Sequence, residues 1–280
     1  MNILKLSVQT ALKRPVIIIV PAVLALVFSI LNSYNPLIPV ILGLSSATGG
    51  SFFDGIISAL QLVLDPAIIP SIAIFLAAAL ILGSLLAGLI FSGYFHIVRN
   101  TLEGIEKVKG DFTEGIKRYF LRIFLITLRA AFFAGLVLGI MSIATVPAII
   151  ISRAAATTKP ELMLAAVFVD VLTAGVLFFA YMFSKVYLLY WVPAAVKTDK
   201  KPFTYAKQLV DEHFWRVVAR FIVFDLVFAV FLFLVIVLSS ALLKMLLSWI
   251  FITVFAIVLV IYVFNSFAEI VISNGQNNGS

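Results

Sequence analysis

The sequence predicts an all-helical integral membrane protein with six transmembrane helices. Hydrophobic residues make up 63% of the 280 positions and charged residues only 12%, whereas a soluble domain carries about 25% charged residues. The mean hydropathy is +1.19. Six apolar runs are long enough for the roughly 20 residues that one helix needs to cross the hydrocarbon core. These runs cover residues 16–34, 69–98, 123–151, 162–196, 217–243 and 246–273.

The lysines and arginines predict the orientation of the spans, because positively charged loops stay on the cytoplasmic side of a membrane. With the N-terminus inside, the outer segments hold only Arg153, Lys159 and Lys244, and two basic residues, Arg129 and Lys185, lie within spans. The other fifteen of the 20 lysines and arginines fall on cytoplasmic segments. Both termini are therefore expected in the cytoplasm.

Two segments outside the spans have a recognisable pattern. The longest outer connection covers residues 35–68, and within it residues 52–64 carry apolar side chains at roughly helical spacing. This spacing predicts an interfacial or re-entrant helix. The last seven residues, 274–280, are polar and are expected to form a disordered tail.

A short amphipathic cytoplasmic helix is predicted before each odd-numbered span. Before the third span, Phe112, Ile116 and Phe120 follow one another at spacings of four and share one helical face. Before the fifth span, Phe203, Ala206 and Val210 form a similar stripe. A shorter stripe precedes the first span and consists of Leu4, Val8, Ala11 and Leu12.

The recurrence of this order suggests an internal repeat. Phe112-Thr113 and Phe203-Thr204 each open a polar segment, and Arg129 and Arg220 follow at the same offset. We interpret residues 1–273 as a single transmembrane domain of three units, at approximately 1–99, 100–196 and 197–273. The alternative is that cytoplasmic loops need basic residues in any membrane protein and form interfacial helices without a common origin.

Residues 188–216 read LLYWVPAAVKTDKKPFTYAKQLVDEHFWR. This segment contains the end of a span with an aromatic residue and a proline, then a short turn with Asp199 and Lys200, then an amphipathic helix before the next span. This order resembles a superfamily of prokaryotic six-span proteins. It includes YciC-like inner-membrane proteins and the membrane domain of bacterial glycerophosphodiester phosphodiesterases. The resemblance implies a prokaryotic plasma membrane. The phosphodiesterase activity resides in a separate soluble domain of those enzymes and is not expected here.

Ionisable residues inside spans are costly and indicate candidate sites. The inner half of the bundle is expected to hold a polar cluster, with Arg129 paired to Asp225 and Lys185 paired to Glu269. This cluster could form a cytoplasm-facing cavity for an anion or a lipid headgroup. Alternatively, its side chains reach the inner headgroups or neutralise one another. The candidate binding residues are Arg129, Lys185, Asp225, Glu269, His96 and Asn265.

Small and aromatic residues predict how the spans pack. Small residues recur at every fourth position in the second span at Ser84, Gly88 and Ser92, and the third span has a similar series at residues 131, 135 and 139. Such faces allow close packing of helices in lipid, within the bundle or between copies of the chain. The phenylalanines of the fifth span are expected to face lipid or to interlock with nearby phenylalanines.

Motifs for enzymatic chemistry were not found. The sequence has no cysteine, no HExxH pair, no P-loop and no GxSxG turn. Its histidines are His96 and His213, and the carboxylates are scattered along the chain. The sequence therefore predicts no catalytic residue, no metal site and no cofactor. The net charge of +7 is dispersed among the spans, which argues against a nucleic-acid partner.

These observations favour a non-enzymatic membrane scaffold or accessory subunit in envelope organisation. Its expected partners are the lipid bilayer, anionic headgroups at the cytoplasmic face, and either another protein or further copies of the chain. The alternative is a transporter or channel-like protein for a small anionic solute or lipid, with the cargo near Arg129, Lys185 and Asp225.

Overall fold

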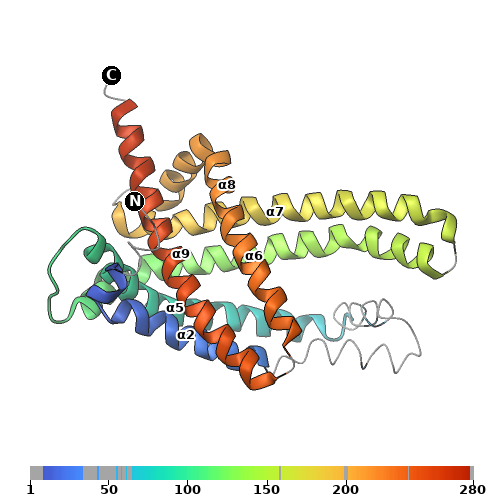
Figure 1. The fold of residues 1–280 in the computed structure, drawn as a ribbon, viewed down its shortest axis with the longest axis horizontal. Coiled ribbons are helices and arrows are strands. Elements are labelled where there is room, and N and C mark those ends of the chain that lie inside the picture. The colour runs from blue at the N-terminus through green and yellow to red at the C-terminus, as the bar shows by residue number, and fades with distance from the viewer. Residues whose placement is uncertain are drawn as a thin grey trace. The chain divides into compact units, whose positions relative to one another are not determined.

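The computed structural model describes residues 9–33, 65–157, 159–198, 201–238 and 240–277, together with Gly43, Gly55, Ser58 and Gln61. The described part of the chain is predominantly helical (Figure 1) and contains no β-strand. The predicted helix at 52–64 lies outside the described residues apart from three of those single positions. The elements, in chain order, are α2 (Val16–Ser33), α5 (Ile69–Leu102), α6 (Asp111–Thr157), the 3-10 helix η1 (Pro160–Leu162), α7 (Met163–Lys197), α8 (Pro202–Val237) and α9 (Ala241–Asn277).

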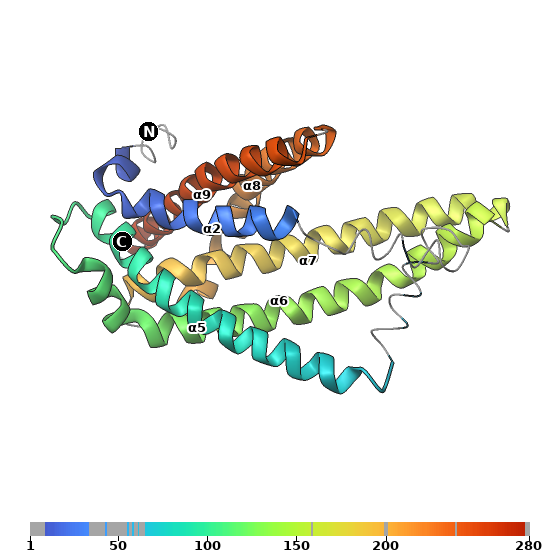
Figure 2. The same ribbon diagram turned by 90° about the horizontal axis from the view of Figure 1, so that it is seen from below.

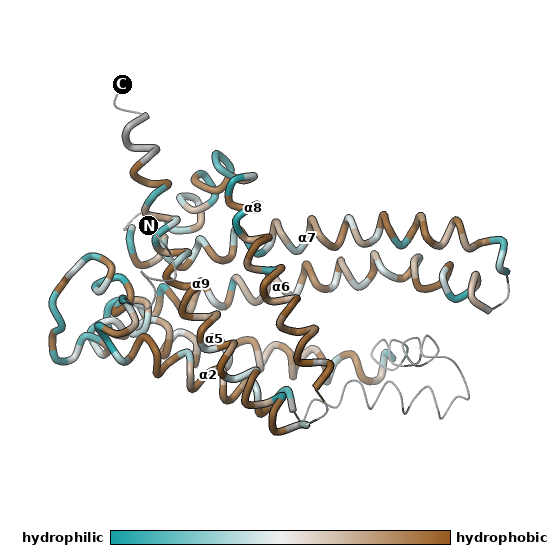
Figure 3. Tube along the Cα trace, viewed as in Figure 1, coloured by the Kyte–Doolittle hydropathy of each residue, from teal (hydrophilic) through white to brown (hydrophobic). Residues whose placement is uncertain are grey.

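Five helices, α5 to α9, are long and apolar enough to cross a membrane. This confirms the prediction of a multi-pass helical membrane protein. Apolar residues run along these helices, whereas hydrophilic residues concentrate at helix ends and in the connection from α5 to α6 (Figure 3). Helix α2 has 18 residues and therefore extends about 27 Å, close to the roughly 30 Å of a hydrocarbon core. The sixth span stays a prediction.

The amphipathic segments differ in how they join the spans. Residues 9–13 form a short helix before Arg14 and Pro15, separate from α2. In α8, His213 departs from helical geometry with φ of −125° and ψ of 17°, which kinks the helix between its amphipathic and apolar parts. In contrast, α6 is one helix of 47 residues from Asp111 onward. The expectation of a separate short helix before the third span is therefore wrong, because the helix that begins at Asp111 continues without a break into the apolar run.

Two helix ends differ from the sequence-based boundaries. Helix α8 ends at Val237, where Leu238 adopts an extended conformation, and α9 begins at Ala241. The fifth apolar run was expected to continue to residue 243, so its last residues belong to the next helix. Hydropathy could not place this turn, because the residues on both sides of it are apolar. At the other end, α9 extends to Asn277, into the segment expected to be a tail.

The chain forms two compact units, which we describe separately. Unit 1 comprises residues 1–34, 84–127 and 185–280, and unit 2 comprises residues 35–83 and 128–184. The expected division into three repeat units stays a prediction.

Aromatic side chains and the α2–α9 contact form the core of unit 1. Helices α2 and α9 pack along each other (Figure 2), and the indole nitrogen of Trp249 donates to the backbone oxygen of Ala22 at 2.8 Å. Between α8 and α9, the rings of Phe231 and Phe251 stack with centroids 3.6 Å apart. Phe233 is 67% exposed. The expected interlocking of phenylalanines is therefore confirmed for Phe231, whereas the lipid-facing position of the exposed ones stays a prediction.

The small residues of the second span pack as predicted. Ser84 and Ser92 are buried, and a Cβ atom at Gly88 would lie 3.1 Å from Cβ of Phe124 on α6. The corresponding glycines of the third span behave differently, because a Cβ atom at Gly135 or Gly139 would meet nothing within 4 Å. The close packing expected at Gly135 and Gly139 is therefore absent from the described part of the chain.

Candidate functional site

Lys185 and Asp225 form an ion pair that connects α7 with α8 in unit 1. Both side chains are largely buried, and Lys185 Nζ also lies 5.6 Å from the ring centre of Phe221. The predicted pairing of Lys185 with Glu269 is wrong. Both lysine and aspartate carry a charge in an apolar environment, so their mutual neutralisation lowers the cost of placing them inside a helical bundle.

Glu269 pairs instead with Arg220, whose position in the sequence predicts a cytoplasmic segment. Arg220 Nη1 and Nη2 donate to the two carboxylate oxygens at 3.3 and 3.5 Å and connect α8 with α9. This pair is more exposed than the first, with 36% and 63% of the two side chains accessible.

The remaining predicted residues have separate environments. Arg129 is exposed and belongs to unit 2, so its pairing with Asp225 of unit 1 stays a prediction. The side-chain nitrogen of Asn265 is buried and has no hydrogen-bond partner in the described part of the chain. Its neighbour Ser266 forms a buried hydrogen bond of 2.7 Å with Tyr190. Within unit 1, the expected cluster residues Lys185, Asp225 and Glu269 belong to two helix-joining ion pairs, and Asn265 belongs to neither pair.

Three arginines of unit 1 join the ends of its helices. Arg14 donates to Asp111 at 2.5 Å, which ties the N-terminal segment to the start of α6. Arg99 Nη1 donates to the backbone oxygen of Val196 at 3.1 Å, and Arg122 Nη1 donates to that of Ala195 at 2.9 Å. Basic groups at the last carbonyls of a helix are favoured by its dipole. The sequence predicts cytoplasmic positions for Arg14, Arg99 and Arg122, but it does not predict these contacts at the helix ends.

The connection from α5 to α6 reverses the chain through two glycines. Gly104 and Gly110 have φ of 73° and 97°, a conformation that glycine adopts without steric cost. A Cβ atom at Gly115 would then lie 2.6 Å from Cβ of His96 and 2.9 Å from the backbone oxygen of Ser92. The first turn of α6 therefore lies directly against α5 at His96.

This close approach brings together His96, Asp111 and Glu114, whose donor atoms all lie within 4.8 Å of one another. His96 is only 4% exposed, and its Nε2 lies 3.2 Å from the side-chain nitrogen of Asn100. Its Nδ1 is buried without a hydrogen-bond partner in the described residues. His96 was a candidate from the sequence, but the two carboxylates were not. Asp111 follows His96 by 15 residues and a loop lies between them, so the sequence pattern does not indicate that they are close.

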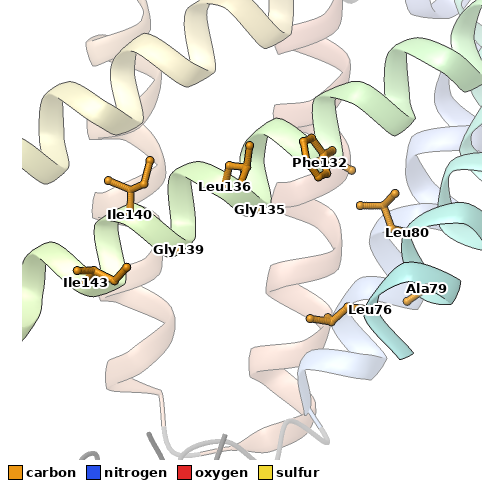
Figure 4. A pocket seen from close by; sticks show the side chains of 10 residues that line it. Leu76, Ala79, Leu80, Phe132, Gly135, Leu136, Gly139, Ile140 and Ile143 are labelled. Carbon is orange, nitrogen blue, oxygen red and sulfur yellow. The ribbon is translucent and has the colours of Figure 1, made fainter. Parts of the chain in front are cut away.

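Unit 2 has a polar contact and an apolar groove. Ser152 donates to both carboxylate oxygens of Asp170 at 3.0 Å, joining α6 with α7. A groove of about 630 Å³ lies between α5 and α6 and is lined by apolar side chains (Figure 4). Its lining includes Leu76 and Leu80 on α5, and Gly135 and Gly139 on α6. The small-residue face that does not pack therefore forms part of this groove.

The fold defines a multi-pass helical membrane protein, and its charged side chains include two helix-joining ion pairs. Comparison with protein-family models, with curated proteins and with solved structures finds no match for this chain. The resemblance to the prokaryotic six-span superfamily stays a prediction.

Proposed function

We propose that the chain is a non-enzymatic scaffold or accessory subunit of a prokaryotic cell membrane, with both termini in the cytoplasm. The observation that carries this proposal is the mutual neutralisation of Lys185 with Asp225 and of Arg220 with Glu269. A transport site for an anion needs cationic groups that the cargo can reach. Here, the lysine and Arg220 join neighbouring helices instead, which suits a rigid frame.

The cytoplasmic face would bind its partner through basic residues that are exposed. Lys107 and Lys109 lie in the α5–α6 connection, and Lys117 and Arg118 follow on the first turns of α6, all exposed. Each basic residue near an anionic surface contributes about 1 kcal/mol. The frame holds this basic face in place through the Arg14–Asp111 contact at the start of α6.

Co-purification from native membranes tests this function. The full chain, carrying an affinity tag, is cross-linked in the membrane, extracted and analysed for stoichiometric partners. We expect a protein partner that co-purifies with the unaltered chain. The double variant Lys107→Gln/Lys109→Gln is expected to retain several-fold less of this partner, because two exposed ion pairs of up to about 1 kcal/mol each are lost. The matched control is Lys159→Gln/Lys244→Gln, which removes the same charge from the predicted outer side.

The transport alternative predicts a different result. A transporter would purify without a stoichiometric protein and would catalyse saturable uptake of an anionic solute into proteoliposomes. Loss of that uptake in Lys185→Met, with unchanged amounts of folded protein, would favour transport and contradict the scaffold.

A further inference from the structure

We propose that His96, Asp111 and Glu114 bind a divalent transition-metal ion of the Zn²⁺ type at the junction of α5 and α6. The three side chains come from the last turns of one helix and the first turn of the next, and their donor atoms lie within 4.8 Å of one another. One imidazole and two carboxylates match the ligands that Zn²⁺ takes in proteins. The inference is independent of the scaffold function.

The histidine is the first argument for a ligand. His96 is 96% buried, and its Nδ1 makes no hydrogen bond in the described part of the chain, whereas buried polar atoms are normally satisfied. A metal ion would satisfy this nitrogen. Nδ1 can bind a metal only if its lone pair is free, so the ring proton must be on Nε2. Nε2 then donates to the side-chain oxygen of Asn100, which faces the ring once the amide is flipped.

The carboxylates also have free acceptor capacity. Arg14 Nη1 donates to Asp111 Oδ2, and the backbone N–H of Val108 points to the same oxygen at 3.4 Å. Oδ1 of Asp111 therefore stays available. The Glu114 side chain is exposed and makes no hydrogen bond among the described residues. Two carboxylates and one imidazole therefore offer three donor atoms to a cation.

Geometry and chemistry narrow the identity of the ion. Zinc–ligand bonds of about 2.0–2.2 Å require the donor atoms to come closer together than their present spacing, and the exposed Glu114 can close this gap by changing rotamer. A histidine ligand disfavours Mg²⁺ and Ca²⁺, which prefer oxygen ligands. Three protein ligands leave a fourth position for water or for a group from a partner.

Cobalt binding tests the proposal, because Co²⁺ substitutes for Zn²⁺ and absorbs visible light. The full-length protein, purified with a histidine-free tag and stripped with a chelator that is then removed, is titrated with Co²⁺ alone. We expect one Co²⁺ per chain with a visible spectrum of four- or five-coordination, displaced by Zn²⁺. Glu114→Gln is expected to weaken Co²⁺ binding at least about tenfold. Mutations of residues that only support the metal ligands already lower metal affinity by about 10–100-fold.

Glu106→Gln is the matched control, since Glu106 is an exposed acid of the same connection. It is expected to bind Co²⁺ like the unaltered chain. His96→Gln is expected to abolish the spectrum, and if this buried substitution prevents folding, Glu114→Gln still decides. Absence of a saturable spectrum in the unaltered chain, or equal binding by Glu114→Gln and Glu106→Gln, would overturn the proposal.

Discussion

Lys185 on α7 forms an ion pair with Asp225 on α8, 40 positions further along the chain. Helices in lipid gain little from hydrophobic burial against one another, so specific contacts of this kind determine which helices pack together. The pair joins α7 and α8 where Phe221 also contacts the lysine. It therefore contributes to the specificity of packing as well as neutralising two charges.

Removing one partner of this pair is expected to destabilise the fold more than removing both. Lys185→Met leaves a largely buried carboxylate without its lysine and is expected to cost about 3 kcal/mol, whereas the double variant Lys185→Met/Asp225→Asn is expected to recover most of this loss. Unfolding by SDS in mixed micelles, followed by tryptophan fluorescence, measures both. Additive losses in the double variant would show that the two side chains act independently.

The Arg220–Glu269 pair is expected to matter much less for stability. Its side chains are 36% and 63% exposed, and exposed ion pairs contribute about 0–1 kcal/mol. Arg220→Gln should therefore change the free energy of unfolding by less than about 1 kcal/mol, measured by the same SDS titration. A loss as large as that of Lys185→Met would contradict the ranking of the two pairs by burial.

The general architecture was predictable, because hydropathy and charge can be read from each segment of the sequence by itself. The partners of the charged residues were not predictable. The apolar run at residues 69–98 predicts a membrane span whatever these residues contact. The choice of Asp225 over Glu269 for Lys185 depends on the rotation of α7 about its axis, which side-chain packing determines. The kink at His213 is also a tertiary feature, since no proline or glycine is present there.

Gly115 tests the contact that creates the candidate metal site. A Cβ atom at this position would lie 2.6 Å from His96 Cβ and 2.9 Å from the Ser92 oxygen, so Gly115→Ala is expected to cost about 1–3 kcal/mol through overpacking. The matched control is Gly135→Ala, where a Cβ atom meets nothing within 4 Å. Alanine there is expected to be neutral or stabilising by up to about 1 kcal/mol. Thermal unfolding in detergent compares the two variants, and similar changes would contradict the close helix approach.

The aromatic contact between α8 and α9 gives a second matched comparison. Phe231 stacks on Phe251 with an interplanar angle of 5°, and aromatic pairs contribute about 0.5–1.5 kcal/mol beyond the area that they bury. Phe231→Ala should therefore lower stability by at least about 1 kcal/mol. Phe233→Ala, at a position that is 67% exposed, should change it far less. The unfolding midpoint of Phe231→Ala is expected to be lower than that of Phe233→Ala. The reverse order would indicate that α8 is rotated differently about its axis.

Sided labelling of single cysteines tests the central claim most directly, because the chain contains no cysteine of its own. Lys107→Cys lies in the α5–α6 connection and Lys159→Cys in the α6–α7 connection, both exposed. If the protein crosses the membrane several times with both termini in the cytoplasm, a membrane-impermeant maleimide labels Lys159→Cys from outside the cell. Lys107→Cys should react only after permeabilisation. Labelling of both positions from outside, or of Lys107→Cys alone, would contradict the topology.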